Sequence, residues 1–515
     1  MNPVVETTAG KVEGFEKDGF KLFLGVPFAA PPVGDRRWLP PAPLEPWAGV
    51  KETRSFVATA PQIIARNPES PLQTGFKVDT SIGTQPDISE DCLHLNIWTP
   101  AADNGRRPVM VWIHGGGFTG GTGASPTYNG GVLLKWGDVV VVTINYRVNV
   151  FGFLRLVDVT GGRIPSTGNE GMLDQVAALE WVRDNIAAFG GDPGNVTIFG
   201  ESAGGGSVGA LLGMPAARGL FQRAIAQSGS ASFLNDVDES NRYAEHFLGA
   251  LGINENDVDS LRALPMNKVL RGYVKSLPVP RGVRGTMPVV DGEVFPEMPI
   301  DSIRAGSADG IPLMAGTTAD EWRLWQVMDP GIADLVEGRI LGRFGRMMPS
   351  LDMTDTVEAY RKALRRRGVP ATPTEIYLAV MTARMFWIPT TRMVQAHTRR
   401  GNPGYCYMVT WKSPFRDGMF GACHAIELGF LWGAHDTDFF GRGPAADALA
   451  RNMQEAWLAF ARTGDPSCEG LGRWSVYGAR RETMMLGERC EVREAPFEEE
   501  RSIWDDIPES AFKWG

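Results

Sequence analysis

Short apolar segments recur along the chain and predict the strands of a buried sheet. Pro108–Ile113, Asp138–Ile144 and Asn195–Phe199 are dominated by β-branched and other apolar residues, and glycine, proline or polar residues bound them. Runs of this length without polar alternation are typical of strands covered on both faces. Ile311–Ala315 and Gly404–Trp411 predict two later strands of the same sheet.

Helical periodicity separates these strands. After Asn169, apolar residues recur at spacings of three and four up to the stop at Gly190, at Leu173, Val176, Leu179, Val182 and Ile186. Strands alternating with helices predict a mostly parallel sheet flanked by helices. No linker-like stretch is evident, so we predict a single α/β domain over 1–515, with a helical cap insertion at about 330–400.

The central motif for chemistry is Gly200–Gly204, with the sequence Gly-Glu-Ser-Ala-Gly. It comes directly after the predicted strand ending at Phe199, and small residues typical of a tightly packed helix begin at Ala203. A strained strand-to-helix turn needs glycine on both sides of the serine and raises its hydroxyl above the sheet. This arrangement predicts Ser202 as a nucleophile and the α/β-hydrolase fold.

A second Gly-x-Ser-x-Gly occurs at Gly205–Gly209. No strand precedes it, so we expect Ser207 to lie inside the helix as a packing residue.

A glycine-rich segment, His114–Phe118, comes after the strand that ends at Ile113. Glycines let the main chain approach a substrate oxygen and offer it N–H groups. We expect the N–H groups of Gly116, Gly117 and Ala203 to form an oxyanion hole. The residues from Gly115 to Gly120 also match a dinucleotide-binding fingerprint, Gly-x-Gly-x-x-Gly, but the residues after them cannot readily open the helix that this fingerprint requires.

A serine nucleophile needs a base, which comes after it in this fold. His424 follows a predicted strand and a loop and is the best candidate. His246 comes too soon after Ser202, His397 lies in a basic helix, and His435 lies in a predicted surface turn. His424 and the nearby Glu427 could form half of a metal site, but further ligands are not evident, so no metal is expected.

The acid that orients the base is less determined by the pattern. Asp320 and Glu321, just after the predicted strand Ile311–Ala315, both qualify. Asp291 is a third candidate, although no clear sheet strand precedes it.

These residues resemble a known family, the type-B carboxylesterases, which include cholinesterases and bacterial p-nitrobenzyl esterases. The resemblance extends from about residue 4 to 507 and is carried by Gly25–Pro32, Glu90–Trp98, Asn145–Arg147, Phe199–Gly205 and Pro215–Gly229. It implies that the acid is Glu321 and that the base is His424.

Other residues take non-catalytic roles by this resemblance. Structural salt bridges would join Arg37 to Glu90 and Arg147 to Asp174. Three further residues would support the site, namely Glu201, Glu427 and Ser228.

The sequence departs from the family pattern at two points, which concern a disulfide and the choice of substrate. Secreted members pair the signature cysteine with an earlier one, but no cysteine precedes Cys92. Cholinesterases hold a quaternary ammonium on a tryptophan in the loop before that signature, and residues 57 to 89 contain none. Choline esters are therefore not expected as the physiological substrate.

Composition excludes several other functions. The net charge of −9 and pI near 5.4 argue against nucleic acid binding. The N-terminus lacks the apolar region of a secretory signal, and no apolar stretch is long enough for a membrane span. Five scattered cysteines without Cys-x-x-Cys spacing favour a cytoplasmic protein. The oligomeric state is not predicted.

Together these features predict a serine carboxylesterase that works through an acyl-enzyme without cofactor or metal. An amidase or carbamate hydrolase is the alternative within the same chemistry, and a catalytically idle binding module is the alternative outside it. A histidine near its usual pKa of about 6.5 predicts activity lost on acidification. The expected pocket walls are Phe118, Met287, Trp322, Trp325, Trp387 and Phe420. Their aromatic content favours aryl or bulky esters as substrates.

Overall fold

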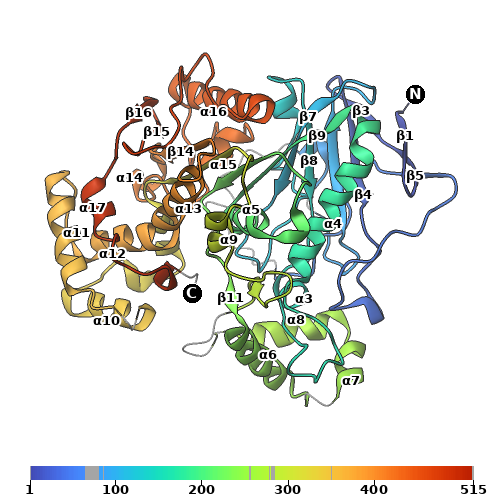
Figure 1. Ribbon diagram of the computed structural model, residues 1–515, viewed down its shortest axis with the longest axis horizontal. Coiled ribbons are helices and arrows are strands. Elements are labelled where there is room, and N and C mark those ends of the chain that lie inside the picture. Colours follow the sequence, from blue (N-terminus) through green and yellow to red (C-terminus); the bar gives the residue numbers. More distant parts are fainter. Residues whose placement is uncertain are drawn as a thin grey trace.

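The computed structural model describes residues 2–63, 80–84, 86–254, 257–277, 279, 285–348 and 351–512. Among these residues, an eleven-stranded sheet runs through the molecule in the order β16-β15-β14-β13-β10-β9-β7-β8-β6-β4-β3 (Figure 1). Its strands are β3 (Phe15–Lys17), β4 (Phe20–Pro27), β6 (His94–Thr99), β7 (Arg107–Ile113), β8 (Val140–Ile144), β9 (Gly191–Glu201), β10 (Arg223–Gln227), β13 (Leu313–Thr318), β14 (Gly404–Val409), β15 (Thr483–Leu486) and β16 (Glu491–Arg493).

The centre of the sheet, from β8 to β15, is parallel, and both edges are antiparallel. The five predicted strands correspond to β7, β8, β9, β13 and β14. Smaller sheets pair β1 (Val4–Thr7), β2 (Gly10–Glu13) and β5 (Val50–Glu52), and β11 (Asn235–Asp236) with β12 (Val289–Val290).

Alternate residues of β7 explain why the sheet is covered on both faces. Val109 and Val111 belong to a buried cluster that includes residues of α4 (Glu170–Asn185) and α5 (Ala203–Gly213). Met110 and Trp112 belong to a second cluster, with residues of α15 (Ile426–Leu431) and α16 (Pro444–Thr463). The predicted α/β fold with a mostly parallel sheet flanked by helices is confirmed.

Helices also fill the connections between strands. Figure 1 shows one group at an end of the molecule, namely α10 (Glu337–Met347), α11 (Thr354–Arg366) and α12 (Pro373–Thr382). A π-helical turn, η7 (Ala383–Trp387), joins α12 to α13 (Ile388–Thr398). The remaining helices of four or more described residues are α2 (Gly131–Leu134), α3 (Asn149–Gly152), α6 (Val237–Leu251), α7 (Val258–Ala263), α8 (Met266–Lys275), α9 (Pro299–Ala305), α14 (Phe415–Gly418) and α17 (Glu498–Ser502), with the short 3₁₀ turns η3 (Ile186–Phe189), η5 (Glu321–Val327) and η8 (Glu509–Phe512).

Candidate active site

Ser202 occupies a sharp turn between β9 and α5. Its backbone is strained, with φ 58° and ψ −121°, a region that residues other than glycine seldom adopt. A Cβ on Gly204 would lie 2.0 Å from the carbonyl oxygen of Ile113, and one on Gly200 2.6 Å from the same atom. Glycine on both sides of the serine is therefore required by the close packing of the turn against β7.

The second serine of the doubled motif has different surroundings. Ser207 is fully buried inside α5, and its hydroxyl accepts a hydrogen bond from the side chain of Gln175 at 3.0 Å. Its burial and its helical position match the packing role expected from the sequence.

The glycine-rich loop after β7 lies directly beside Ser202. A Cβ on Gly115 would be 3.1 Å from the Cβ of Ser202. Gly116 and Gly117 both have positive φ, at +114° and +64°. Among the described residues, neither of their N–H groups donates to a protein acceptor. Ala203 is the first residue of α5, so its N–H has no acceptor within the helix. The loop that bears Gly116 and Gly117 thus lies beside the serine turn, and Ala203 belongs to that turn.

His114 supports this loop, a role that the sequence pattern did not predict. Its Nδ1 lies 2.8 Å from the carbonyl oxygen of Gly115, and its ring stacks on Tyr146 at 4.3 Å between centroids. The Tyr146 hydroxyl donates to the carbonyl oxygen of His114 at 2.8 Å. Burial lowers the pKa of His114 to about 4, which keeps the ring neutral. The histidine before the glycines was the available signal.

Glu321 and His424 lie in direct contact. Nδ1 of His424 donates to Oε2 of Glu321 at 2.6 Å, and both side chains are buried. The other oxygen of Glu321 accepts hydrogen bonds from the Ser228 hydroxyl at 2.6 Å and the Thr318 N–H at 2.8 Å. Both oxygens of this carboxylate therefore have partners that fix its orientation.

The other candidate acids and bases have different partners. Asp320 accepts from the N–H of Ala422 at 2.9 Å, and Asp291 accepts from the side chain of Asn169 at 3.1 Å. His246 contacts the carbonyl oxygen of Ser276, and His435 contacts Asp447, each at 3.0 Å. The geometry thus separates Glu321 from Asp320, which the pattern alone had left open.

Glu201 lies on the opposite side of the imidazole. Its Oε1 is 3.1 Å from Nε2 of His424. Within the described part of the chain, no hydrogen bond joins the Ser202 hydroxyl to His424. Catalytic hydrogen bonds are often long or misaligned without substrate and tighten only in the complex. The arrangement holds the base beside the serine turn, with a carboxylate on each ring nitrogen.

The carboxylates change the titration of this site. Burial alone lowers the pKa of His424, but Glu201 and Glu321 more than offset this effect and raise it to about 9. Burial raises the pKa of Glu201 to about 7, with His424 opposing the rise and Glu321 adding to it. Burial also raises the pKa of Glu427 to about 8, and Glu201 adds to that rise. The expectation of a histidine near its usual pKa is therefore wrong.

Aromatic rings flank the imidazole of His424. The rings of Trp325 and Phe386 lie 5.1 and 4.7 Å from it, and Trp322 stacks on Trp325.

Three other predicted pocket walls pack against aromatic rings other than those beside His424. Phe118 packs on Phe153, Trp387 on Phe497, and Phe420 on Phe415 and Phe439. Met287 is buried in the cluster that includes α4 and α5. The aromatic content of the sequence could not separate these core contacts from the site.

Both expected salt bridges are present and buried. Arg37 donates to both carboxylate oxygens of Glu90 at 2.6 and 2.5 Å. Arg147 donates to both oxygens of Asp174 at 2.8 and 2.7 Å. Two parallel hydrogen bonds per pair make this the strongest geometry for arginine and carboxylate.

Several further expectations concern ligands and compartments. All five cysteines are unpaired. In the described part of the chain, no cluster of three or more potential metal ligands occurs, and no helix is both long and apolar enough to cross a membrane. In the loop that lacks tryptophan, residues 64–79 and 85 lie outside the described residues.

Comparison with known proteins agrees with this architecture. The model of the carboxylesterase family matches residues 1–504. The chain is 35% identical over 510 residues to the para-nitrobenzyl esterase of Bacillus subtilis, covering 97% of each chain. It is also 35% identical to liver carboxylesterase 1 of mouse, covering 98% of this chain and 93% of that one. A crystal structure of the Geobacillus stearothermophilus carboxylesterase EST55 superposes with a TM-score of 0.86 at 41% identity, covering 98% of this chain and 100% of that one.

The chain belongs to the carboxylesterase family and is a carboxylic ester hydrolase of the α/β-hydrolase fold.

Proposed function

We propose that Ser202, His424 and Glu321 are the catalytic triad of this esterase and that Gly116, Gly117 and Ala203 form its oxyanion hole. The observation that carries the assignment is the 2.6 Å contact between His424 and Glu321 beside the strained turn that bears Ser202. A buried carboxylate that fixes the tautomer of a histidine is the arrangement that activates a serine.

The reaction proceeds in two acyl transfers. Neutral His424 accepts the proton of Ser202 through Nε2 while the hydroxyl oxygen attacks the ester carbonyl carbon. The carbonyl oxygen becomes an oxyanion, which the N–H groups of Gly116, Gly117 and Ala203 stabilise. His424 then gives the proton to the leaving alcohol as the carbon–oxygen bond breaks. Water repeats these steps on the acyl-enzyme and releases the acid.

Glu321 and Glu201 hold opposite sides of the base. Glu321 keeps the proton on Nδ1, so that Nε2 is free to accept one, and stabilises the imidazolium that forms. Glu201 lies 3.1 Å from Nε2 and competes with Ser202 for the same nitrogen. Productive attack therefore includes a small shift of the imidazole or the hydroxyl toward one another.

The direct test is hydrolysis of p-nitrophenyl esters from acetate to palmitate by wild type, Ser202→Ala and Ser207→Ala. We expect Ser202→Ala to fall to background and Ser207→Ala to keep most of its rate, because Ser207 is buried inside α5, where its hydroxyl contacts Gln175 and Met172. The best chain length gives the size of the acyl pocket. A Ser202→Ala protein as active as wild type would refute the triad.

Amide or carbamate hydrolysis by the same residues is the second candidate. One relative, 34% identical over 494 residues, is named phenmedipham hydrolase, from Pseudarthrobacter oxydans. Phenmedipham and p-nitroacetanilide belong in the same assay, where Ser202-dependent turnover above that of the esters would favour this candidate.

Three broader proposals concern the helical cap, the cellular compartment and the substrate. The helices from α10 to α13 form the predicted cap, since the η7 turn between them brings Phe386 to within 4.7 Å of the His424 ring. Unpaired thiols at all five cysteines favour a reducing, cytoplasmic compartment. The physiological substrate is a small-molecule ester bound without cofactor.

A further inference from the structure

The short η5 helix separates the aromatic surroundings of His424 from a surface cavity. It begins at Glu321 itself and runs to Val327. A 3₁₀-helix has three residues per turn, so side chains three positions apart share a face. Trp322 and Trp325 therefore lie on one face, and Arg323 and Gln326 lie on the next.

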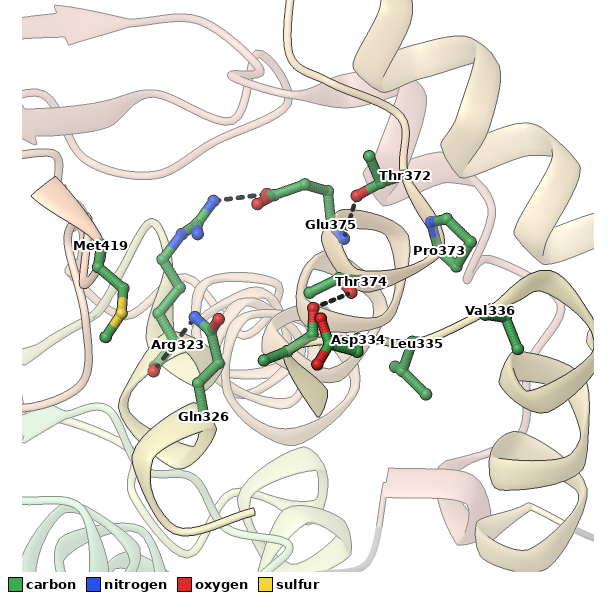
Figure 2. A pocket seen from close by; sticks show the side chains of 11 residues that line it. Arg323, Gln326, Asp334, Leu335, Val336, Thr372, Pro373, Thr374, Glu375 and Met419 are labelled. Carbon is green, nitrogen blue, oxygen red and sulfur yellow. Dashed lines mark hydrogen bonds and ion pairs between the residues drawn. The ribbon is translucent and has the colours of Figure 1, made fainter. Parts of the chain in front are cut away.

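The face with Arg323 and Gln326 lines a cavity of about 670 Å³ (Figure 2). Figure 2 shows the Arg323 guanidinium directed at Glu375, at the start of α12, with which it forms an ion pair. Asp320 approaches the same guanidinium at 3.5 Å, and the Gln326 side chain donates to the carbonyl oxygen of Arg323 at 3.4 Å. These contacts hold η5 in place from its outer side.

The tryptophan face of η5 lies against the catalytic base. The Trp322 and Trp325 rings stack with centroids 4.5 Å apart and planes 14° from parallel. The Trp325 ring is 5.1 Å from His424, and Phe386 completes the cluster at 5.7 Å from Trp325. Phe386 is fully buried, but both tryptophans are only partly buried. Trp322 and Trp325 thus form a stacked and partly exposed pair of indoles beside His424, and η5 holds this pair in place.

We propose that Trp322 and Trp325 form an aryl-binding surface that makes this enzyme prefer esters carrying a planar aromatic group. Planar rings gain more than saturated rings of equal size from stacking or edge contact with indole. Because η5 is already fixed on its outer side, little ordering is needed when such a group binds. This inference rests on the proposed function, since it places the aryl group next to His424.

The test compares substrates that differ only in ring aromaticity. On the acyl side, these are p-nitrophenyl phenylacetate and p-nitrophenyl cyclohexylacetate, which share a leaving group. On the alcohol side, these are benzyl acetate and cyclohexylmethyl acetate. Each ratio of kcat/KM is divided by the ratio of the hydroxide-catalysed rates. We expect wild type to favour the aromatic ester about three- to tenfold in at least one pair.

Variants assign this preference to the two indoles. Trp325→Leu and Trp322→Leu should bring the corrected ratio close to one, whereas Trp325→Phe and Trp322→Phe should keep most of it. Trp387→Leu is the matched control, because Trp387 packs on Phe497 and, among the described residues, makes no ring contact with His424 or with the two indoles. A folding defect lowers both rates of a pair together and leaves their ratio unchanged, so the readout is independent of expression and stability.

The outcomes separate this inference from the proposed function. Ser202-dependent hydrolysis with corrected ratios near one in both pairs, or ratios that the leucine variants leave unchanged, would overturn the aryl-binding surface alone. Hydrolysis that does not depend on Ser202 would overturn the proposed function and this inference with it.

Discussion

The neighbouring carboxyl groups at positions 320 and 321 differ in what they touch. Glu321 contacts His424 at 2.6 Å, whereas Asp320 contacts the Ala422 N–H and the Arg323 side chain. We expect Glu321→Gln to lower kcat by about 10³- to 10⁴-fold, as the loss of the orienting acid does in serine proteases. Asp320→Asn should stay within about tenfold of wild type. Equal losses in the two variants would contradict the assignment of the acid.

The charge of Glu201 sets the pH range in which the base is neutral. A raised pKa means that His424 is protonated, and therefore inactive as a base, up to a higher pH than a free histidine. We expect kcat/KM to rise with pH along a limb whose midpoint lies above 6.5. Glu201→Gln removes the carboxylate nearest Nε2 and should move that limb to lower pH.

The control for this prediction is Glu427→Gln. Glu427 also raises the pKa of His424, but by less than Glu201 or Glu321. Its limb should therefore move less than that of Glu201→Gln. Profiles of kcat/KM that superpose for wild type and Glu201→Gln would refute this electrostatic account.

Individual residues also show which features of the site could be predicted from the sequence. Ser202 was predictable because a strand, two glycines and a helix are local features that force one geometry. Asp320 and Glu321 stayed equivalent in pattern because their difference depends on Ser228 and His424, both distant in sequence. The raised pKa of His424 was not predictable for the same reason, since it depends mainly on Glu201 and Glu321, which only the fold brings to this histidine.

At the scale of elements, the glycine-rich loop after β7 connects backbone conformation with the proposed oxyanion hole. A Cβ on Gly116 would lie 2.3 Å from the carbonyl oxygen of Gly120, but one on Gly117 would meet only the Thr119 hydroxyl at 3.8 Å. We expect Gly116→Ala to lower kcat by about 10²-fold or more, because the loop must shift its N–H groups. Gly117→Ala should cost less, since only its positive φ is unfavourable.

The readout is kcat for p-nitrophenyl acetate, together with the thermal unfolding temperature. A Gly116→Ala protein that unfolds like wild type and keeps its rate would mean that this loop does not form the oxyanion hole.

Elements differed in how well their sequence predicted them. The strands β7, β8 and β9 were clear because strands covered on both faces have unbroken apolar sequences. The positions of the η5 and η7 turns beside the site were not clear, because Trp322, Trp325 and Phe386 are apolar aromatic residues of the kind that also fill the core. Only their contacts with His424 distinguish them.

At the scale of the whole molecule, buried ion pairs join distant segments. Arg147 lies just after β8 and Asp174 lies in α4, and both are almost fully buried. Asp174→Asn would leave the guanidinium without its counter-charge, which we expect to lower the free energy of unfolding by about 3–5 kcal/mol. Asp301→Asn is the matched control, because Asp301 pairs with Arg304 at the surface, where such pairs contribute about 0–1 kcal/mol.

Denaturant unfolding of the two variants at one pH measures this difference. Equal stabilities would contradict a structural role for the buried pair. The folded fraction of Asp174→Asn should have the esterase activity of wild type, since neither Arg147 nor Asp174 contacts the triad.

The proposed mechanism requires an acyl group on Ser202, and this intermediate can be trapped. The enzyme is mixed with a slowly deacylating p-nitrophenyl ester, quenched in acid during the burst of p-nitrophenol, digested and analysed by fragmentation mass spectrometry. We predict one acyl group per chain, placed on Ser202 and absent from Ser207. An acyl group on another residue, or a full burst without any acylated peptide, would contradict the account.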